Sequence, residues 1–323
     1  MIVTLSDILS ARRRIAPHVV RTPLRRSEWL SRRTGGEVFL KLESLQPTNS
    51  FKIRGAFNAA LQHLDGPLRG ASIITASAGN HGRALAYAGE RLGFRPIVYA
   101  PETAPAAKLD AIRAHGADLR LARHYDEAEA QAKAHAASGA GVWLSPFSHP
   151  DIVAGAGTIG LEIIEDLPEV DTVVVPVGGG GLISGIGIAI KAIAPRVEIV
   201  GVEVEASHPF ADGLKAGRIV PITVGPSLAD GLVGNLDPDT ITFEIARRVV
   251  DRFVLVSEDH LIKGLRGLVA HDHLIAEGAG VAAIAAVLAA QAEARGRTTA
   301  VILSGANIDA ERLTKLLDTR GTA

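Results

Sequence analysis

The chain is organised around one stretch, Ser44-Leu45-Gln46-Pro47-Thr48-Asn49-Ser50-Phe51-Lys52-Ile53-Arg54-Gly55-Ala56. Residues 37–42, just before it, are β-branched and aliphatic and predict a short strand. Residues 53–63, just after it, combine good helix formers with an apolar stripe and predict a helix. Lys52 therefore lies at a helix start, where the helix dipole disfavours a protonated amine.

A lysine in that place has two interpretations. The ordinary one is a solvated side chain, and for a single lysine it is the favoured one. The other is an amine of lowered pKa that forms a Schiff base with a carbonyl cofactor. Three further stretches match the second interpretation: Ser77-Ala78-Gly79-Asn80-His81-Gly82, Val175-Pro176-Val177-Gly178-Gly179-Gly180-Gly181-Leu182-Ile183-Ser184 and Leu303-Ser304-Gly305-Ala306-Asn307.

Composition restricts the class of protein. The chain has 323 residues, of which 47% are hydrophobic and 4% aromatic, which is typical of a helix-rich α/β enzyme. The formal net charge of −1 gives no electrostatic case for nucleic acid or an anionic membrane as partner. Cysteine is absent, which excludes disulfides and thiol catalysis. We find no signal peptide or membrane span, so we expect a cytoplasmic protein, and no regulatory domain after residue 323.

Strand and helix patterns alternate along most of the chain. Between residues 71 and 144 they recur about every 25 residues, which indicates βαβ units and a parallel sheet. The proline-rich segment 145–150 predicts a domain boundary. A second alternating set follows, and it includes helices expected at residues 258–272 and 280–294. The fold class predicted is α/β.

The four glycines Gly178, Gly179, Gly180 and Gly181 stand between a buried strand and a helix. Without Cβ atoms their N–H groups can close around an anion at the helix start, which predicts a phosphate site. A tight turn is the simpler interpretation. A dinucleotide fold is a sharper competitor, because Gly179, Gly181 and Ser184 fit its spacing and Glu203 follows at the distance of a ribose-binding acid. It leaves Lys52 and the other motifs without roles.

Taken in order, the four motifs resemble those of the pyridoxal-phosphate-dependent threonine dehydratase and serine racemase family. The resemblance extends over about residues 20–310. It implies the second pyridoxal-phosphate fold type, similar to the tryptophan synthase β chain, with parallel-rich sheets. It further implies a large domain of residues 1–71 and 150–323, a small inserted domain of residues 72–149, pyridoxal 5'-phosphate between them, and a homodimer.

The resemblance also assigns roles to cofactor-binding residues. Lys52 would hold the cofactor and act as the catalytic base, and the glycine loop would bind its phosphate. Phe51 would pack on the pyridine ring, although an ordinary core aromatic is the alternative. Asn80 would hydrogen-bond the ring 3-oxygen. Ser304 would face the ring nitrogen, with a helix N-cap as its alternative, and Glu277 matches a family acid near the cofactor, with a solvated helix cap as its alternative.

The loop at residues 77–82 is expected to bind the substrate carboxylate through Ser77 and its amide groups, so the substrate-binding set is Ser77, Ala78, Gly79 and His81. We interpret His81 as structural rather than catalytic. The racemases of the family have a serine at the position of Ala78, where it serves as acid and base on the opposite face of Cα. Because alanine cannot transfer a proton, the sequence favours a dehydratase over a racemase.

The predicted function is elimination of water from a β-hydroxy amino acid such as threonine or serine, which gives a 2-oxo acid and ammonia. Asn49, where many relatives have glycine, suggests a variant pocket similar to that of the dehydratases of hydroxyectoine utilisation. A metal site stays open, because Glu203 matches one family ligand but Pro209 stands where another is expected. An NAD-dependent oxidoreductase and a small-molecule binding protein without a cofactor are the alternatives from other classes.

Overall fold

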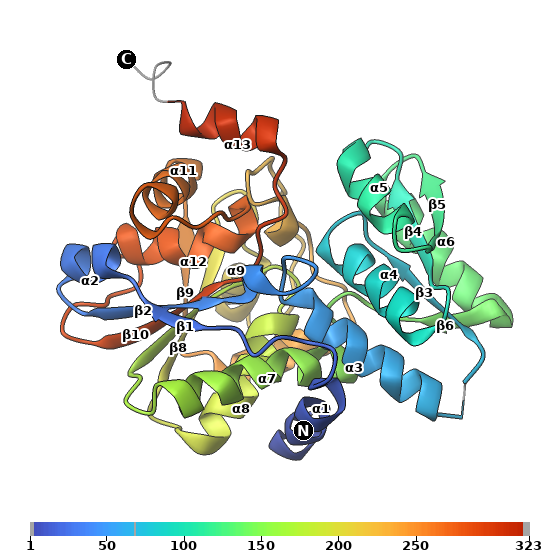
Figure 1. The fold of residues 1–323 in the computed structure, drawn as a ribbon, viewed down its shortest axis with the longest axis horizontal. Helices are drawn as coiled ribbons and strands as arrows, with labels where there is room; N and C mark the ends of the chain where they lie inside the picture. The colour runs from blue at the N-terminus through green and yellow to red at the C-terminus, as the bar shows by residue number, and fades with distance from the viewer. Residues whose placement is uncertain (1–2, 68, 319–323) are drawn as a thin grey trace.

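A computed structural model describes residues 3–67 and 69–318 of the chain. It contains two sheets that lie side by side, each covered by helices (Figure 1). The larger sheet has six strands in the order β1-β2-β10-β7-β8-β9, and every neighbouring pair is parallel except β1 and β2. Its strands are β1 (Leu24–Arg26), β2 (Glu37–Leu42), β7 (Thr172–Pro176), β8 (Glu198–Val204), β9 (Arg252–Val256) and β10 (Thr298–Leu303).

The smaller sheet is parallel throughout and has the order β5-β4-β3-β6. Its strands are β3 (Ser72–Ala76), β4 (Ile97–Pro101), β5 (Asp118–Ala122) and β6 (Gly141–Trp143). Helices α4 (Asn80–Leu92) and α5 (Ala106–Arg113) cover one face, and α6 (Tyr125–His135) covers the other. Gly93 ends α4 in the left-handed conformation, as a glycine directly after a helix commonly does.

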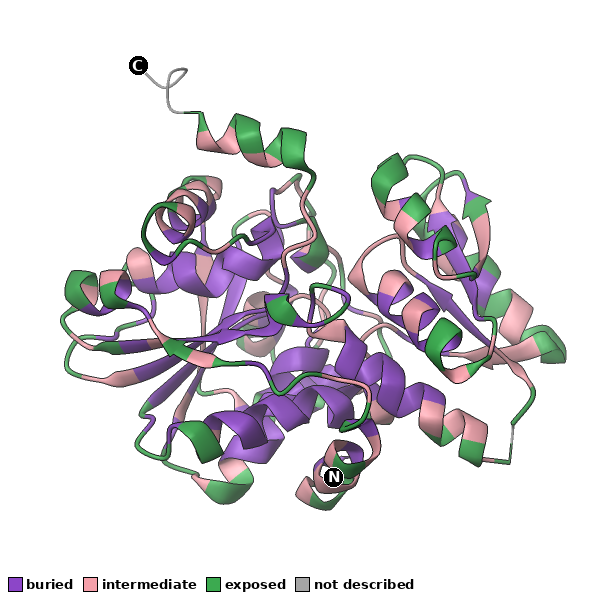
Figure 2. Cartoon of the chain, viewed as in Figure 1, coloured by how far each residue is buried: buried purple, intermediate pink, exposed green. Residues whose placement is uncertain are grey.

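Helices cover both faces of the larger sheet, and its central strands are buried throughout (Figure 2). Val173 and Val175 of β7 face α7 and α8, whereas Val174 between them faces α12, as the period of two along a strand requires. This burial on both faces is why residues 172–177 are continuously apolar. The helices of this part of the molecule are α1 (Leu5–Ile15), α2 (Glu28–Thr34), α3 (Lys52–Asp65), α7 (Pro150–Asp166), α8 (Gly181–Ile193), α9 (Pro209–Ala216), α10 (Ile241–Val249), α11 (Glu258–Gly267), α12 (Gly278–Leu288) and α13 (Ala310–Leu317).

Helix α3 begins at Lys52 and lies between the two sheets, where it packs on both α7 and α4. The crossing with α7 is close. A Cβ added at Gly155 would lie 2.6 Å from the Arg54 carbonyl oxygen and 2.7 Å from the Gly55 Cα, so this approach requires glycine. The contact fixes the first turn of α3, and with it the base of the Lys52 side chain.

The α/β class with parallel-rich sheets is confirmed. The predicted division at residues 71 and 150 stays a proposal, supported by the fact that β3 to β6 form a sheet of their own. The helix expected at 258–272 is α-helical only to Gly267 and continues as a π-helical turn. The helix expected at 280–294 ends at Leu288, because Ala290 takes a positive φ of 57° and the Gln291 N–H bonds back to the Ala286 carbonyl.

Four helices that the sequence analysis did not predict are present: α2, α9, α10 and α13. Each is short, and three of them follow a polar N-cap residue at Ser27, Thr240 and Asp309. Within the described residues, no helix combines the length and the apolar character needed to cross a membrane.

Candidate active site

One cavity of about 570 Å³ opens where the two sheets face each other. Its wall is formed by the start of α3, the loop after β3, the loop after β7, and segments before α12 and after β10. The structure therefore brings together motifs that are up to about 250 residues apart. All residues predicted for the site line this cavity: Phe51, Lys52, Ser77, Ala78, Gly79, Asn80, His81, Gly178, Gly179, Gly180, Gly181 and Ser304.

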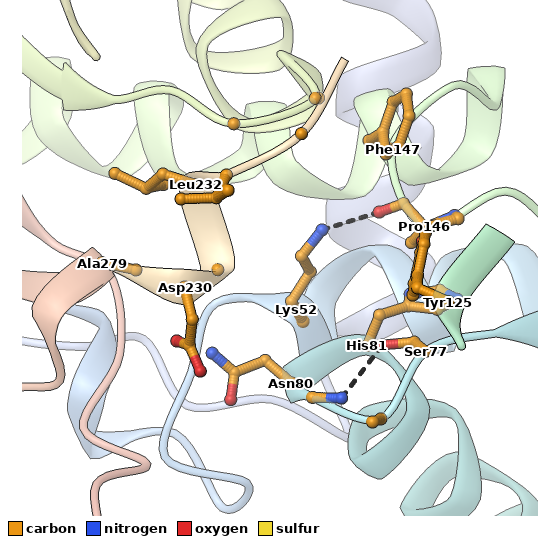
Figure 3. A pocket seen from close by; sticks show the side chains of 18 of the residues that line it. Lys52, Ser77, Asn80, His81, Tyr125, Pro146, Phe147, Asp230, Leu232 and Ala279 are labelled. Carbon is orange, nitrogen blue, oxygen red and sulfur yellow. Dashed lines mark hydrogen bonds between the residues drawn. The ribbon is translucent and has the colours of Figure 1, made fainter. Parts of the chain in front are cut away.

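The Lys52 side chain is partly buried and points into the cavity, where its Nζ donates a 2.7 Å hydrogen bond to the Pro146 carbonyl (Figure 3). Among the described residues, no carboxylate lies within ion-pairing distance of this amine. Burial lowers the pKa of Lys52 from 10.5 to about 8. Near neutral pH a useful fraction of the amine is thus available as a nucleophile or base.

The glycine loop forms the turn between β7 and α8. Gly180 is the N-cap of α8 and has a φ of 82°, a left-handed conformation that favours glycine. A Cβ at Gly179 would overlap the Phe147 ring, and one at Gly180 would overlap Phe210. The first N–H groups of α8 have no partner within the helix and face the cavity end of the loop, which suits an anion. Close packing alone also demands glycine here, so substitutions in this loop cannot isolate phosphate binding.

The loop at residues 77–82 leads from β3 into α4, whose first residue is Asn80. The Ser77 hydroxyl accepts the Gly79 N–H at 3.2 Å, which shapes the loop around the start of the helix. Ala78 and Gly79 present a methyl group and bare backbone to the cavity. The loop thus offers helix-terminal N–H groups to a carboxylate and, at Ala78, no group that can carry a proton.

His81 is only 2% exposed, and neither ring nitrogen has a hydrogen-bond partner among the described residues. Its pKa lies well below the usual value, first because of burial and then because of Lys52 and His149. The ring is therefore neutral at physiological pH. The interpretation of His81 as purely structural leaves these two nitrogens unexplained, since buried polar atoms are nearly always paired.

Asn80 and Glu277 meet across the cavity wall. The Asn80 Nδ2 donates to the Glu277 Oε1 at 2.6 Å, which joins the start of α4 to the N-cap of α12. Burial raises the pKa of Glu277 to about 7, although the hydrogen bond from Asn80 opposes this shift. Glu277 is buried, so its interpretation as a solvated helix cap is wrong. A Cβ at Gly305 would overlap the Glu277 Oε1, so this contact depends on that glycine.

Ser304 and Phe51 come from opposite ends of the sequence and meet beside Lys52. The Phe51 N–H donates to the Ser304 carbonyl at 3.0 Å. The Ser304 hydroxyl is buried and has a weak contact of 3.5 Å with the Ala279 carbonyl, so it remains available to a ligand. The alternative of a helix N-cap at Ser304 is wrong, because the next helix begins at Ala310 and its N-cap is Asp309.

Part of the cavity wall was missed by the sequence analysis. Residues 226–237 form the side opposite α4 and α5, and Lys108 of α5 reaches Asp230 at 2.5 Å across the opening. A long segment without helix or strand periodicity, containing the Asp230-Gly231 turn, was the available signal. The role of the Pro146 carbonyl could not be found from side-chain types at all, since any residue supplies a carbonyl.

Two expectations change with the structure. Asn49 is exposed, lies outside the cavity lining and has a φ of 55°, a conformation that asparagine tolerates better than most residues. Its replacement of glycine is explained by backbone conformation, so it gives no reason to expect a variant pocket. Glu203 is buried and accepts the N–H groups of Phe210 and Ala211 at 2.9 and 2.8 Å, so it is not free to bind a ribose.

A metal site gains no support from the described residues. Across residues 3–67 and 69–318, no group of three or more His, Cys, Asp and Glu side chains is arranged to hold an ion. Glu203, the residue matched to a family metal ligand, has both carboxylate oxygens occupied at the start of α9. Pro209 is the first residue of that helix.

Pyridoxal phosphate requires an amine for its aldehyde, an anion site for its phosphate and room for a pyridine ring between them. The cavity supplies Lys52, the glycine loop at the start of α8, and Ser304 beyond them. The weakly bonded Ser304 hydroxyl is a polar atom still able to bind a ligand. The residues present therefore fit this cofactor.

Comparison with known proteins agrees with this geometry. The family described as "pyridoxal-phosphate dependent enzyme" matches residues 15–305. The chain is 41% identical over 318 residues to an L-threonine ammonia-lyase of Thermotoga maritima, with 98% of this chain and 78% of that protein covered.

Two solved structures are similar over nearly their whole length. Threonine deaminase isoform 2 from Solanum lycopersicum superposes with a TM-score of 0.91 at 34% identity, covering 99% of this chain and 88% of that one. Maize serine racemase superposes with a TM-score of 0.91 at 29% identity, covering 98% and 97%. Similarity in fold is thus shared between lyases and racemases, and the site must distinguish them.

Proposed function

The chain belongs to the family of pyridoxal-phosphate-dependent enzymes and is a lyase of the dehydratase type, and from this premise we propose that its substrate is an L-β-hydroxy amino acid, L-threonine or L-serine. The products are a 2-oxo acid and ammonia. Membership of this family decides against the NAD-dependent oxidoreductase and the binding protein without a cofactor. A cytoplasmic location and a homodimer remain proposals.

One observation carries this proposal. Lys52, a partly buried amine with a pKa near 8 and no acidic partner among the described residues, faces the glycine loop within a single cavity. An amine in this state can attack an aldehyde and can later accept a proton from carbon. The Pro146 carbonyl holds the Nζ at 2.7 Å and so limits the directions in which it can act.

When bound, pyridoxal phosphate supplies an electron-withdrawing ring that makes the Cα proton of an attached amino acid acidic. Lys52 is placed to take that proton at its Nζ and, as an ammonium, to return it toward the departing hydroxyl. The N–H groups at the start of α4 bind the substrate carboxylate and so orient Cα toward Lys52. The glycine loop anchors the phosphate at the opposite end of the cavity.

The choice of elimination over racemisation rests on two residues. Ala78 offers no proton on the wall that the loop after β3 forms. Ser304 offers a hydroxyl, which cannot keep a pyridine nitrogen protonated as a carboxylate would, so the ring withdraws electrons less strongly. Both features favour loss of the β-hydroxyl in step with removal of the Cα proton.

The test uses the full chain loaded with pyridoxal phosphate. After borohydride reduction and digestion, mass spectrometry should find the cofactor on the peptide that contains Lys52. L-Threonine should yield 2-oxobutanoate and L-serine pyruvate, each with one ammonia. Replacing Lys52 with alanine should lower this turnover by more than about 1,000-fold, because the base and the attachment point are lost together.

A comparison of cofactors tests the phosphate site without changing the tightly packed glycines. The chain should bind pyridoxal phosphate much more tightly than pyridoxal, which lacks the anion but keeps the aldehyde and ring. Equal affinities would show that the glycine loop is only a turn. Labelling at any lysine other than Lys52 would overturn the assignment of the catalytic residue.

A further inference from the structure

Asn307 is the centre of a chain of polar side chains behind the cavity wall. Its Nδ2 donates to the Asn80 Oδ1 at 2.6 Å and to the Thr48 carbonyl at 2.9 Å. Its Oδ1 accepts from the Nη1 of Arg83 at 2.6 Å. Asn80 continues the chain to Glu277. This series of hydrogen bonds thus links α4, beside the smaller sheet, to segments that belong with the larger sheet.

The direction of each hydrogen bond in this chain is fixed by chemistry. A guanidinium group has donors only, so the Asn307 atom that faces Arg83 must be the oxygen. The Thr48 carbonyl is an acceptor only, so the atom that faces it must be the Asn307 nitrogen. Two independent groups therefore hold the Asn307 amide in one orientation, and its second N–H is left for Asn80.

The orientation of the Asn80 side-chain amide follows in the same way. Because the Asn307 Nδ2 is a donor, the atom of Asn80 opposite it must be the Oδ1. The Asn80 NH2 group is consequently turned toward Glu277 and the cavity. One of its two N–H bonds is used by the Glu277 Oε1, and the other remains available inside the site.

We propose that Asn307 and Arg83 are positioning residues that hold the Asn80 amide with its NH2 group, and never its oxygen, toward the cofactor. This inference rests on the proposed function and on the role that the family resemblance implies for Asn80, donation to the ring 3-oxygen. A donor at that oxygen stabilises its ionised form, whereas an amide oxygen there would repel it. The hydrogen bonds that run from Arg83 through Asn307 to Asn80 would therefore set the ionisation of the ring 3-oxygen as well as the position of the ring.

The position of Asn307 makes a purely packing role a poor explanation. Asn307 is half-buried and lies outside the cavity lining, and among its hydrogen-bond partners in the described residues Asn80 is the one that lines the cavity. Arg83 Nε is buried and has no partner among the described residues, so its guanidinium is held here at some cost. Within the described part of the chain, the guanidinium of Arg83 makes one hydrogen bond, to Asn307.

The decisive variant is Asn307→Asp, which keeps the shape but replaces the donor with an acceptor. An aspartate can still pair with Arg83 but loses the bond to the Thr48 carbonyl, so circular dichroism should first show that the fold is retained. The aspartate would force the Asn80 amide to turn, and the Asn80 oxygen would then face the cofactor. We expect cofactor affinity to fall by about 10-fold to 100-fold. The yellow absorbance of the lysine-bound cofactor should also decrease in favour of a band in the ultraviolet, since the ring oxygen becomes protonated.

The matched control is Asn49→Asp, the same exchange at a residue 3.4 Å from the Asn307 Oδ1. Asn49 is exposed, so an aspartate there can turn into solvent, and its positive φ is tolerated by aspartate. We expect neither the affinity nor the spectrum to change. Asn307→Ala removes the constraint without reversing it, so its spectrum should lie between those of the parent and Asn307→Asp.

Asn80→Ala separates failure of this inference from failure of the proposed function. If Asn80→Ala leaves both cofactor affinity and the spectrum unchanged, then Asn80 does not contact the ring and its assigned role is wrong. If Asn80→Ala changes both but Asn307→Asp leaves the spectrum as in the parent, the positioning role of Asn307 and Arg83 is refuted. The same refutation follows if Asn307→Asp weakens binding without any spectral change, since that is a packing effect.

Discussion

Lys52 and Arg54 are two residues apart on the first turn of α3, yet their surroundings are opposite. Lys52 faces the cavity, has one hydrogen bond to a carbonyl, and has a pKa lowered by burial. Arg54 points the other way and is 1% exposed, with carboxylates on two sides. Burial lowers the pKa of Arg54 too, but Glu43 and Glu162 raise it by more. One buried cation is left reactive, and the other is fully neutralised.

The cluster around Arg54 is closed. Its guanidinium donates to both oxygens of Glu43 at 2.8 Å and to both oxygens of Glu162 at 2.6 and 2.9 Å. Lys41 adds a second cation, 2.6 Å from Glu162. The pKa of Glu43 is lowered, because the attraction of Arg54 outweighs the effect of burial. Two cations and two anions therefore balance without solvent.

One helix turn thus serves both stability and reactivity. The closed cluster ties β2, α3 and α7 together behind the site. On the same helix turn, the Lys52 amine keeps a carbonyl contact and has no acidic partner among the described residues. Buried polar atoms that stay unpaired cost free energy, and His81, on the cavity wall, has two of them among the described residues.

The largest expected effect comes from exchanging each cation for methionine. Arg54→Met leaves Glu43 buried with Lys41 as the remaining cation nearby, and it should lower the free energy of unfolding by about 3–5 kcal/mol. Lys52→Met removes only an amine that burial already disfavours, so it should not lower the stability of the cofactor-free protein. Urea denaturation of both variants without cofactor measures this difference.

The pH dependence of stability should also distinguish Lys52 from Arg54. The folded pKa of Lys52 is near 8 and the ordinary value is 10.5, so between these values the unfolded chain binds more protons. The stability of the cofactor-free parent should therefore rise with pH across this window by an amount that Lys52→Met lacks. Equal destabilisation by the two methionine variants would show that Lys52 is as much a part of the structural framework as Arg54.

A smaller effect is expected at Glu277, a buried acid that, unlike Glu43, has no cation partner within 4 Å among the residues that the structure describes. Burial raises its pKa to about 7, the Asn80 hydrogen bond and Lys108 lower it, and Asp230 raises it. As the pH rises through 7, Glu277 gains a negative charge beside an anionic cofactor. Cofactor affinity should then decrease by up to about 10-fold more in the parent than in Glu277→Gln. Equilibrium dialysis between pH 6 and 8 measures both.

Titration of the cofactor itself and of Lys52 is common to the parent and the glutamine variant, so only their difference reports on Glu277. Parallel affinity curves would mean that Glu277 does not change its charge in this range. Glu277 and Glu43 would then each keep one charge state between pH 6 and 8, and they would differ only in the groups that surround them.

The residues around Lys52 could be predicted from the sequence, whereas the ion-pair cluster around Arg54 could not. Lys52, the glycine loop, Asn80 and Ser304 belong to motifs with unusual local chemistry, such as a cation at a helix start or four successive glycines. Strands such as β7 could be predicted because they are continuously apolar, as buried parallel strands are.

What the sequence could not provide is the pairing of distant polar residues. Glu43 and Glu162 are separated by more than 100 residues, and nothing local marks either as the partner of Arg54. The same holds for Asn80 and Glu277, and for Pro146, which contributes only a carbonyl. Helices such as α9 and α13 have only eight residues each, a length at which an isolated helix is marginal, so they depend on the tertiary packing around them.

The smallest expected effect concerns Ala78, on the cavity wall formed by the loop after β3. Racemisation requires a proton donor on the face of Cα opposite Lys52, and alanine has none. The parent should consume one enantiomer of its substrate and release no antipode. Ala78→Ser restores a hydroxyl, so it should produce slow racemisation or faster exchange of the Cα proton with solvent.

The gain should be small because a serine hydroxyl of ordinary pKa is a weak acid and a weak base near neutral pH. A general acid must also lie within hydrogen-bond reach of the carbon that it protonates, and its pKa must be tuned by neighbouring groups. Chiral chromatography of residual substrate, together with deuterium uptake at Cα, measures both products of such a transfer. Ala78→Gly, which adds no proton donor, is the matched control and should show neither. Racemisation by the parent at a rate comparable with elimination would contradict the dehydratase assignment, because a proton would then reach Cα although Ala78 carries no proton donor.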